Sequence, residues 1–314
     1  MEKDYGHKPV LLEECLEALA VRPEGIYLDG TLGRAGHSLE ILRRLTTGRL
    51  IGVDRDLAAI EAARERLAEF GDRVTLVHGN FSDLGDILQN LGIVGVDGML
   101  FDLGVSSPQL DEPRRGFSYM HDAPLDMRMD ETAALDAFQV VNTWSYEELR
   151  RILFEYGEER YAPQIARAVV RAREDKPVGT TGELAELIRS AMPSKALREK
   201  QHPAKRSFQA IRIAVNGELD ALPPMLDAAA EALLPGGRLA VITFHSLEDR
   251  IVKQRLRELA TGCTCPPEFP VCVCGKKPKL RLVNRKPVVS GPAELAENPR
   301  ARSAKLRAAE RTEF

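Results

Sequence analysis

Short apolar runs alternate with amphipathic stretches through the first hundred residues, and this alternation limits the fold more than any other feature. Runs at 26–29, 49–54, 74–77 and 99–102 have the length and apolar content of buried strands. The stretches at 37–45 and 57–70 carry apolar residues at helical spacing. Strands that alternate with helices of this length form parallel sheets with helices on both faces. The sequence therefore predicts an α/β fold with a doubly wound, Rossmann-like sheet.

The alternation stops after residue 102, and the next strand of comparable quality is at 237–244. A loop rich in Pro, Gly, Asp and Met occupies 104–130, and a helical stretch follows it. Capping boxes at Ser145-x-x-Glu148 and Thr180-x-x-Glu183 open two of these helices. A connection this long, with apolar faces of its own, predicts an inserted all-helical subdomain. We expect the sheet domain at 1–108 and 204–314, with the insertion at 109–203.

The formal net charge of −3 excludes a uniformly basic protein but conceals an uneven distribution. Residues 276–311 hold eleven Lys or Arg and three Glu, which gives +8 there and −11 elsewhere. A second basic patch lies at 195–212. Either patch alone is as consistent with a solvated face as with a binding surface. Together they favour a polyanionic partner.

Nothing in the sequence points to a membrane or to export. No apolar run approaches the roughly 20 residues needed to cross a bilayer. The stretch 1–7 has no signal-peptide character. We expect a cytoplasmic protein without a membrane partner.

A glycine turn follows the first predicted strand, with the pattern Gly30-x-x-Gly33-x-x-Gly36. A strand, a glycine turn and a helix in this order bring backbone amides to the carboxyl edge of a sheet, where a ligand can approach closely. Asp54 ends the second strand, where a ribose hydroxyl pair lies in nucleotide sites of this kind. The pattern fits a dinucleotide or S-adenosylmethionine (SAM), and a tight turn without a ligand is the alternative.

Two further strand ends carry candidate residues. Asp102 ends the fourth strand and is predicted to face the same crevice. The loop after it is predicted to expose Phe117 and Tyr119 next to Arg114 and Arg115, an arrangement suited to base stacking and phosphate contact. These aromatic residues could equally pack the loop down. His245, at the end of the fifth strand, is a candidate for substrate contact, because the Ser and Asp adjacent to it cannot form a hydrolase triad with it.

Four of the five cysteines form a C-x-C-x₆-C-x-C cluster: Cys263, Cys265, Cys272 and Cys274. Four thiolates suffice for a tetrahedral zinc ion, although C-x-C is not the usual zinc spacing. Free thiols or disulfides in a surface excursion are the alternatives. We expect no catalytic metal, because the pattern leaves no open coordination position.

The motifs together resemble those of one family, the RsmH (MraW) family of SAM-dependent 16S rRNA cytosine-N4 methyltransferases. The resemblance extends over the chain from end to end. Its segments are 7–12 (HKPVLL), 29–38 (DGTLGRAGHS), 53–56 (VDRD), 101–110 (FDLGVSSPQL), 115–120 (RGFSYM), 124–130 (PLDMRMD), 202–210 (HPAKRSFQA), 244–252 (FHSLEDRIV) and 298–303 (NPRARS).

The resemblance implies a class I methyltransferase sheet and methylation of N4 of the P-site cytidine at 16S position 1402. It implies 16S rRNA within the 30S subunit as the partner, with the protein a monomer or a homodimer. The insertion would then be the substrate-recognition domain. The implied SAM contacts are Ala35, Gly36, His37, Asp54, Phe81, Asp102 and Gln109. The family often has Gly where this chain has Ala35.

The chemistry suggests further roles. The cytosine amine is a poor nucleophile, and an acceptor for its N–H would localise the lone pair. Asp102, or the backbone carbonyls of the turn at 104–107, would supply this acceptor, and Asp102 is the predicted catalytic residue. Predicted substrate contacts are Arg115, Phe117, Tyr119, Arg206 and His245. Two other classes are the alternatives, a nicotinamide oxidoreductase and a non-catalytic ribosome-assembly factor.

Overall fold

The computed structural model describes residues 9–266 and 268–314, so the stretch 1–7 and the start of the segment at 7–12 lie outside the described residues. The chain divides into two compact units. The sheet unit comprises Met1–Gly104 and Leu219–Phe314, and the helical unit comprises Val105–Glu218. The boundaries therefore fall after Gly104 and Glu218, rather than after residues 108 and 203.

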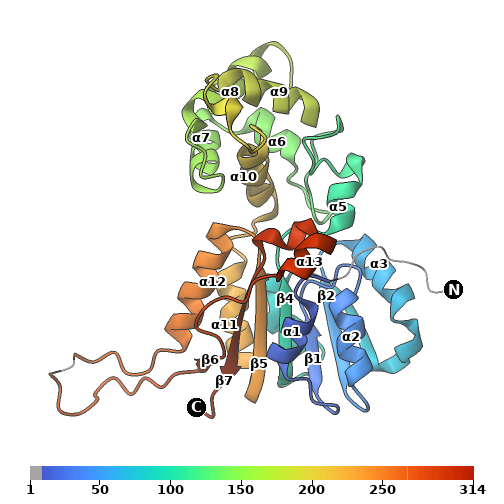
Figure 1. The fold of residues 1–314 in the computed structure, drawn as a ribbon, viewed down its shortest axis with the longest axis vertical. Coiled ribbons are helices and arrows are strands. Elements are labelled where there is room, and N and C mark those ends of the chain that lie inside the picture. Colours follow the sequence, from blue (N-terminus) through green and yellow to red (C-terminus); the bar gives the residue numbers. More distant parts are fainter. Residues whose placement is uncertain (1–8, 267) are drawn as a thin grey trace. The chain divides into compact units, whose positions relative to one another are not determined.

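The sheet has seven strands in the order β3-β2-β1-β4-β5-β7-β6 (Figure 1). Strands β1 to β5 are parallel, and β7 runs antiparallel to both β5 and β6. The bounds are β1 Ile26–Asp29, β2 Arg49–Asp54, β3 Val74–His78, β4 Val96–Asp102, β5 Leu233–Thr243, β6 Leu280–Leu282 and β7 Lys305–Arg311. The expected α/β class with a doubly wound, Rossmann-like sheet is confirmed.

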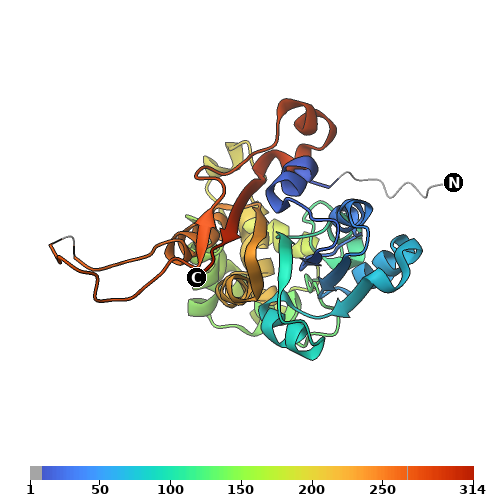
Figure 2. The same cartoon turned by 90° about the horizontal axis from the view of Figure 1, so that it is seen from below.

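Helices cover both faces of the sheet, as the alternating sequence predicts (Figures 1 and 2). One core joins the strands to α4 (Leu84–Asn90), α11 (Leu222–Ala232) and α12 (Ser246–Leu259). The other joins them to α1 (Leu12–Leu19), α2 (Gly36–Arg44) and α3 (Leu57–Arg66). Successive strand residues alternate between the two cores, with Tyr27 in one and Leu28 in the other.

Shorter elements complete the sheet unit. They are α13 (Pro292–Glu297) and the 3₁₀ turns η1 (Ala68–Arg73), η2 (Phe81–Asp83) and η5 (Pro299–Ser303). Among the described residues, no helix is long and apolar enough to cross a membrane.

The helical unit has its own apolar core. Its elements are α5 (Ser107–Asp111), η3 (Pro113–Arg115), α6 (Ala137–Thr143), α7 (Tyr146–Glu155), α8 (Ala162–Asp175), α9 (Thr181–Ala191), η4 (Ala196–Arg198) and α10 (Lys205–Asn216). Both predicted capping boxes are present, at Ser145 and at Thr180.

The later second boundary has a physical reason in α10. We expected this helix to belong to the sheet domain. Its apolar side chains Phe208, Ile211 and Val215 instead lie in the core of the helical unit. The helix ends at Gly217, which has a left-handed conformation (φ 59°), and the chain returns to the sheet unit at Leu219.

Candidate functional site

Three aspartates end neighbouring parallel strands of the sheet unit. Asp29 ends β1, Asp54 ends β2 and Asp102 ends β4, in the sheet order β2-β1-β4. The chain leaves β1 toward one edge of the sheet, and β4 and β5 build the other side. The carboxyl ends of β1 and β4 are therefore the topological switch point, where open α/β sheets bind ligands.

The turn after β1 approaches β4 so closely that only glycine fits. A Cβ atom on Gly30 would lie 2.2 Å from the Phe101 ring. The Gly30 amide donates to the Leu100 carbonyl at 2.9 Å, and the Asp102 amide donates to Thr31 Oγ1 at 2.6 Å. The glycine turn is thus fixed directly against the end of β4.

Ala35 adopts the left-handed conformation that glycine favours, with φ 55°. It is the N-cap residue of α2, and it is fully buried. This conformation costs an L-residue with a Cβ atom roughly 1–2 kcal/mol. Gly36 and His37 follow as the first residues of α2, whose first-turn amides have no acceptors within the helix.

Asp54 joins the end of β2 to the glycine turn. Its Oδ2 accepts from the Gly33 amide and its Oδ1 accepts from the Asp56 amide, both at 2.8 Å. Burial raises the pKa of Asp54 to about 6. Each carboxylate oxygen has a second acceptor position, so both remain able to accept from a ligand hydroxyl.

Asp102 has a carboxylate oxygen without a partner among the described residues. This oxygen, Oδ1, is buried, although the side chain as a whole is 26% exposed. Burial, reinforced by the charges of Asp29 and Glu248, raises the pKa of Asp102 to about 8. An unsatisfied buried acceptor is costly unless a ligand supplies the missing donor.

His37 lies beside Asp102, with Nδ1 3.9 Å from the carboxylate Oδ2. Burial lowers the pKa of His37 to about 4, so the ring is neutral near pH 7. Its Nε2 is 3.0 Å from the Val10 carbonyl oxygen, and this contact assigns the ring proton to Nε2. The Nδ1 lone pair therefore faces Asp102 and disfavours its ionised form.

Asp29, Thr31 and Ser38 support this acidic edge, although none of them was among the predicted site residues. Asp29 is buried and accepts from Ser38 Oγ at 2.7 Å and from the Thr31 amide at 3.2 Å. Burial raises the pKa of Asp29 to about 6. The hydroxyl side chains of Thr31 and Ser38, close to an aspartate in the same turn and helix, were the available signal.

Phe81 lies just after β3, at the start of η2. Its ring meets the buried Phe101 ring edge to face, with centroids 6.0 Å apart. The sheet unit thus brings six of the seven predicted cofactor residues to the carboxyl ends of its strands and the turns that follow them. Gln109 belongs to the helical unit, where its side chain completes a capping box with Ser106 on α5.

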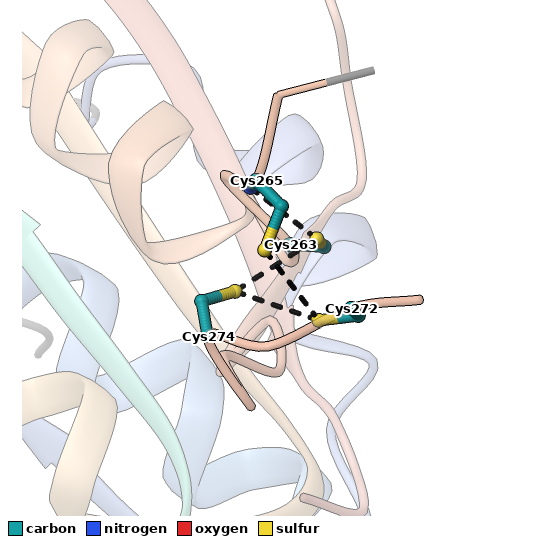
Figure 3. A group of neighbouring side chains, drawn as sticks. All are labelled: Cys263, Cys265, Cys272 and Cys274. Carbon is teal, nitrogen blue, oxygen red and sulfur yellow. Dashed lines mark hydrogen bonds between the residues drawn. The ribbon is translucent and has the colours of Figure 1, made fainter. Parts of the chain in front are cut away.

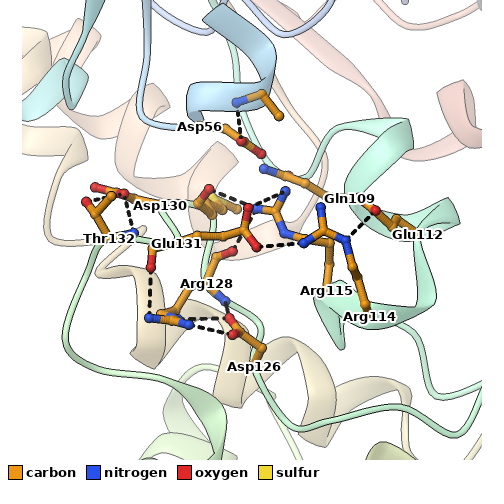
Figure 4. Close-up of polar contacts among 12 residues, drawn as sticks. Asp56, Gln109, Glu112, Arg114, Arg115, Asp126, Arg128, Asp130, Glu131 and Thr132 are labelled. Carbon is orange, nitrogen blue, oxygen red and sulfur yellow. Dashed lines mark hydrogen bonds and ion pairs between the residues drawn. The ribbon is translucent and has the colours of Figure 1, made fainter. Parts of the chain in front are cut away.

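Two predicted substrate residues are buried within the helical unit, contrary to the expectation of an exposed surface. Phe117 is 6% exposed, and the Arg115 side chain is 3% exposed. The Arg115 guanidinium donates to the carbonyl oxygens of Arg128 and Met129 at 3.0 and 2.9 Å. Figure 4 shows Arg115 within a polar network that includes the bidentate pair of Arg128 and Asp126. These residues hold the loop together.

Tyr119 is half-buried and stacks on His202, with centroids 4.4 Å apart. It also meets the Phe208 ring edge to face at 5.5 Å. The alternative interpretation, in which the aromatic residues pack the loop down, therefore describes Phe117 fully and Tyr119 in large part.

The two basic patches differ in how many of their charges are paired. In the C-terminal patch, Lys305 and Arg307 pair with Asp249 at 3.1 and 2.7 Å. Lys279 and Arg281 also form ion pairs with glutamates. In the patch at 195–212, Arg212 pairs with Glu218, whereas five basic side chains make no ion pair within the described part of the chain: Lys195, Arg198, Lys200, Lys205 and Arg206. We call this set the basic segment.

His245 is the N-cap residue of α12. Its Nδ1 accepts from the Glu248 amide at 3.4 Å, and its side chain is 10% exposed. Its Nε2 lies 3.1 Å from Glu248 Oε1, but Nε2 has no hydrogen-bond partner among the described residues. His245 therefore has a structural role at the helix start, and the predicted substrate contact remains a prediction.

Comparison with known proteins gives matches over nearly the whole chain. The model of a family described as the MraW methylase family matches residues 4–312. A protein of Symbiobacterium thermophilum named ribosomal RNA small subunit methyltransferase H is 59% identical over 97% of this chain and 96% of its own length. Proteins of the same name from Paenibacillus sp. and Heliobacterium modesticaldum are 58% and 57% identical, each over 98% of this chain and 99% of their own length.

Proposed function

The chain belongs to the MraW methylase family, and from this premise we propose that it transfers a methyl group from SAM to N4 of the P-site cytidine at position 1402 of 16S rRNA. The relatives named ribosomal RNA small subunit methyltransferase H support the rRNA substrate. The target base, cytidine 1402, and the target atom, N4, are implied by the resemblance of the sequence motifs. Under this proposal the substrate is the 30S subunit and the helical unit recognises it.

The observation that carries the proposal is the unpartnered, buried Oδ1 of Asp102 beside the glycine turn. An acceptor of this kind, next to a turn that tolerates no Cβ at Gly30, fits a site for a ligand that brings a hydrogen-bond donor. The neighbouring acids at the ends of β1 and β2 are both satisfied by donors of the chain. Of the three, only Asp102 has a carboxylate oxygen with no donor among the described residues.

The residues that would hold SAM lie at the same carboxyl edge of the sheet. Asp54 has acceptor positions for the ribose hydroxyls, and Phe81 offers an aromatic ring for the adenine. The amides of Gly36 and His37 begin α2 and are suited to the carboxylate of the amino-acid part, whereas the Ala35 amide donates to the Leu32 carbonyl oxygen at 2.7 Å. When bound, SAM supplies a methyl group on a sulfonium, which is transferred by in-line displacement.

In this reaction the chain chiefly orients the acceptor base and takes up charge. Asp102 Oδ1 would accept a hydrogen bond from the N4 amino group and so make its lone pair more available. Only the ionised carboxylate is a pure acceptor, so this role needs Asp102 deprotonated. A nearby positive charge lowers the pKa of a carboxyl group, which favours that state in the loaded enzyme.

The basic segment is the part of the helical unit that best suits rRNA, because its charges are not neutralised within the described residues. The target base must also be unstacked before its N4 can react. Half-buried Tyr119 and the partly exposed Arg206 are the predicted substrate residues of this unit that keep some exposure. Arg115 and Phe117 would act by holding the loop that carries Tyr119.

The test is to incubate 30S subunits with labelled SAM and to map the labelled nucleotide. We expect label at N4 of cytidine 1402 and none when Asp102 is replaced by Asn. Label at another nucleotide would overturn the proposed target. Binding of 30S without any transfer would indicate an assembly factor. Binding of NAD but not SAM in calorimetry would indicate an oxidoreductase.

A further inference from the structure

A long excursion joins α12 to β6 in the sheet unit and contains the four clustered cysteines. It projects away from the sheet in both views (Figures 1 and 2). None of its described residues between Arg257 and Lys279 is buried. The Lys279 amide donates to the Leu259 carbonyl at 2.9 Å and closes its base. A segment without buried side chains has no apolar core to hold its conformation.

The four cysteine sulfurs nevertheless meet at one point of this excursion (Figure 3). All four Sγ atoms lie within 4.8 Å of one another. The Cys272–Cys274, Cys263–Cys274 and Cys265–Cys272 sulfurs are 3.6, 3.8 and 4.0 Å apart. The two C-x-C pairs therefore face each other across the excursion.

These distances match a tetrahedral metal site. With Zn–S bonds of about 2.3 Å, the edge of a ZnS₄ tetrahedron is about 3.8 Å. Two disulfides would bring the sulfurs together only in pairs. Here Cys272 and Cys274 each have two other sulfurs within 4.0 Å.

Backbone amides point at the sulfurs as they do in metal–thiolate sites. The Cys265 amide donates to Cys263 Sγ and the Val273 amide donates to Cys265 Sγ, each at 3.4 Å. Hydrogen bonds of this kind stabilise metal-bound thiolates. Lys276 and Lys277 follow the last cysteine and can offset the negative charge of a tetrathiolate centre.

We propose that Cys263, Cys265, Cys272 and Cys274 bind one zinc ion as a structural site that holds the excursion together. The ion has four thiolate ligands and no open position, so it takes no part in catalysis. The site is independent of the methyl transfer proposed above. Without the ion the excursion loses the bond between its two cysteine pairs and becomes accessible to proteases.

The test uses the full chain, purified with a tag that lacks histidine and cysteine. Elemental analysis is expected to find about one zinc per chain. Cys265→Ser and Cys272→Ser are expected to weaken zinc binding about 100-fold or more, as judged by competition with a chromogenic chelator. Thr264→Ser, in the same excursion, is the matched control and should keep its zinc.

Two further measurements distinguish this site from other thiol chemistry. Cobalt(II) in place of zinc is expected to give the visible spectrum of a tetrahedral tetrathiolate, lost in Cys272→Ser and kept in Thr264→Ser. Chelation should accelerate tryptic cleavage after Lys276 in the unsubstituted protein. In Cys272→Ser the cleavage should be fast with or without chelator.

Several results would overturn the proposal. Mass spectrometry could find two disulfides, or elemental analysis could find stoichiometric iron. The purified chain could contain no zinc and four freely reactive thiols in excess zinc. Equal zinc contents in the cysteine variants and the control would place the metal elsewhere. Circular dichroism of each variant verifies that the sheet and helical units remain folded, since the excursion contributes nothing to either core.

Discussion

Asp102 differs from Asp29 and Asp54 in what satisfies its carboxylate. The chain donates to both oxygens of the latter two, whereas Oδ1 of Asp102 has no partner among the described residues. A carboxylate kept unsatisfied at a strand end costs stability and is typical of a functional site. Two predictions test this interpretation.

Asp102→Asn is expected to lower kcat by about 100-fold or more, because the amide cannot accept charge as the carboxylate does. The dissociation constant for SAM should change by no more than about threefold. Single-turnover rates with 30S subunits and calorimetry with SAM measure the two effects separately. Asp83→Asn, which changes an exposed carboxylate of the same unit, is the control. An equal loss in turnover and in affinity would reassign Asp102 to cofactor binding.

The second prediction concerns stability against pH. The folded pKa of Asp102 is about 8, and unfolded aspartate titrates near 3.9. The unfolded chain therefore releases this proton first, and the free energy of unfolding falls as the pH rises between those values. Asp102→Asn removes this titratable group, and with it the pH-dependent loss of stability. In urea unfolding it should be more stable than the unsubstituted protein by more than about 1 kcal/mol at pH 9, with a smaller difference at pH 4. A constant difference at all pH values would contradict the raised pKa.

Substitutions of Ala35 test how much its left-handed backbone conformation, in the turn proposed for the cofactor, affects stability. Ala35→Gly relieves the left-handed strain but loses a buried methyl group and gains entropy in the unfolded state, so its stability should change by less than about 1 kcal/mol. Ala35→Val adds a β-branched side chain at positive φ in a fully buried position. It should destabilise by about 2 kcal/mol or more in the same urea assay. Similar losses in both variants would mean that the methyl group matters and the conformation does not.

At the scale of elements, the basic segment gathers five basic side chains that make no ion pair among the described residues into one short stretch of the helical unit. Replacing Lys195, Arg198 and Lys200 by Glu is expected to weaken 30S binding. It should also reduce the slope of log affinity against log salt by about 0.7–0.9 for each lost phosphate contact. Filter binding over a salt series measures both. Arg150→Glu, on exposed α7 surface, is the control. A loss of affinity with an unchanged slope would argue against phosphate contacts.

Some strands of the sheet could be predicted from the sequence, and others could not. The strands β1 and β2 have the predicted bounds, because a short apolar run between turn residues has few other conformations. Strand β7 was missed because it is rich in basic residues. Its Arg307 is buried only because Asp249 of α12 pairs with it, and a sequence does not show which distant acid will do so.

The loop at 115–130 was misjudged for a related reason. Aromatic and basic residues in a Gly- and Pro-rich loop suggest an exposed surface, yet Phe117 and Arg115 are buried. The acceptors that satisfy Arg115 are backbone carbonyls, which any sequence provides. The motif was recognisable, but whether its residues contact a ligand or hold the loop depends on tertiary packing.

At the scale of the whole molecule, the chain has separate cores in its two units. Each of the two units is large enough to unfold cooperatively by itself, as is common for domains with separate cores. The aspartates and the glycine turn proposed for SAM all lie in the sheet unit. A ligand stabilises only the part of a protein whose folded state it binds.

SAM is therefore expected to act on one of two unfolding transitions. At 100 times its dissociation constant, it should stabilise the sheet unit by about 2.7 kcal/mol. Calorimetry measures the transitions, and hydrogen exchange assigns them, with β4 and α8 as reporters of the two units. We expect β4 amides to gain protection and α8 amides to remain unchanged, because α8 contributes only to the core of the helical unit. A single transition that rises as a whole, with equal protection in β4 and α8, would instead mean that the two units fold as one cooperative body and that the cofactor stabilises both.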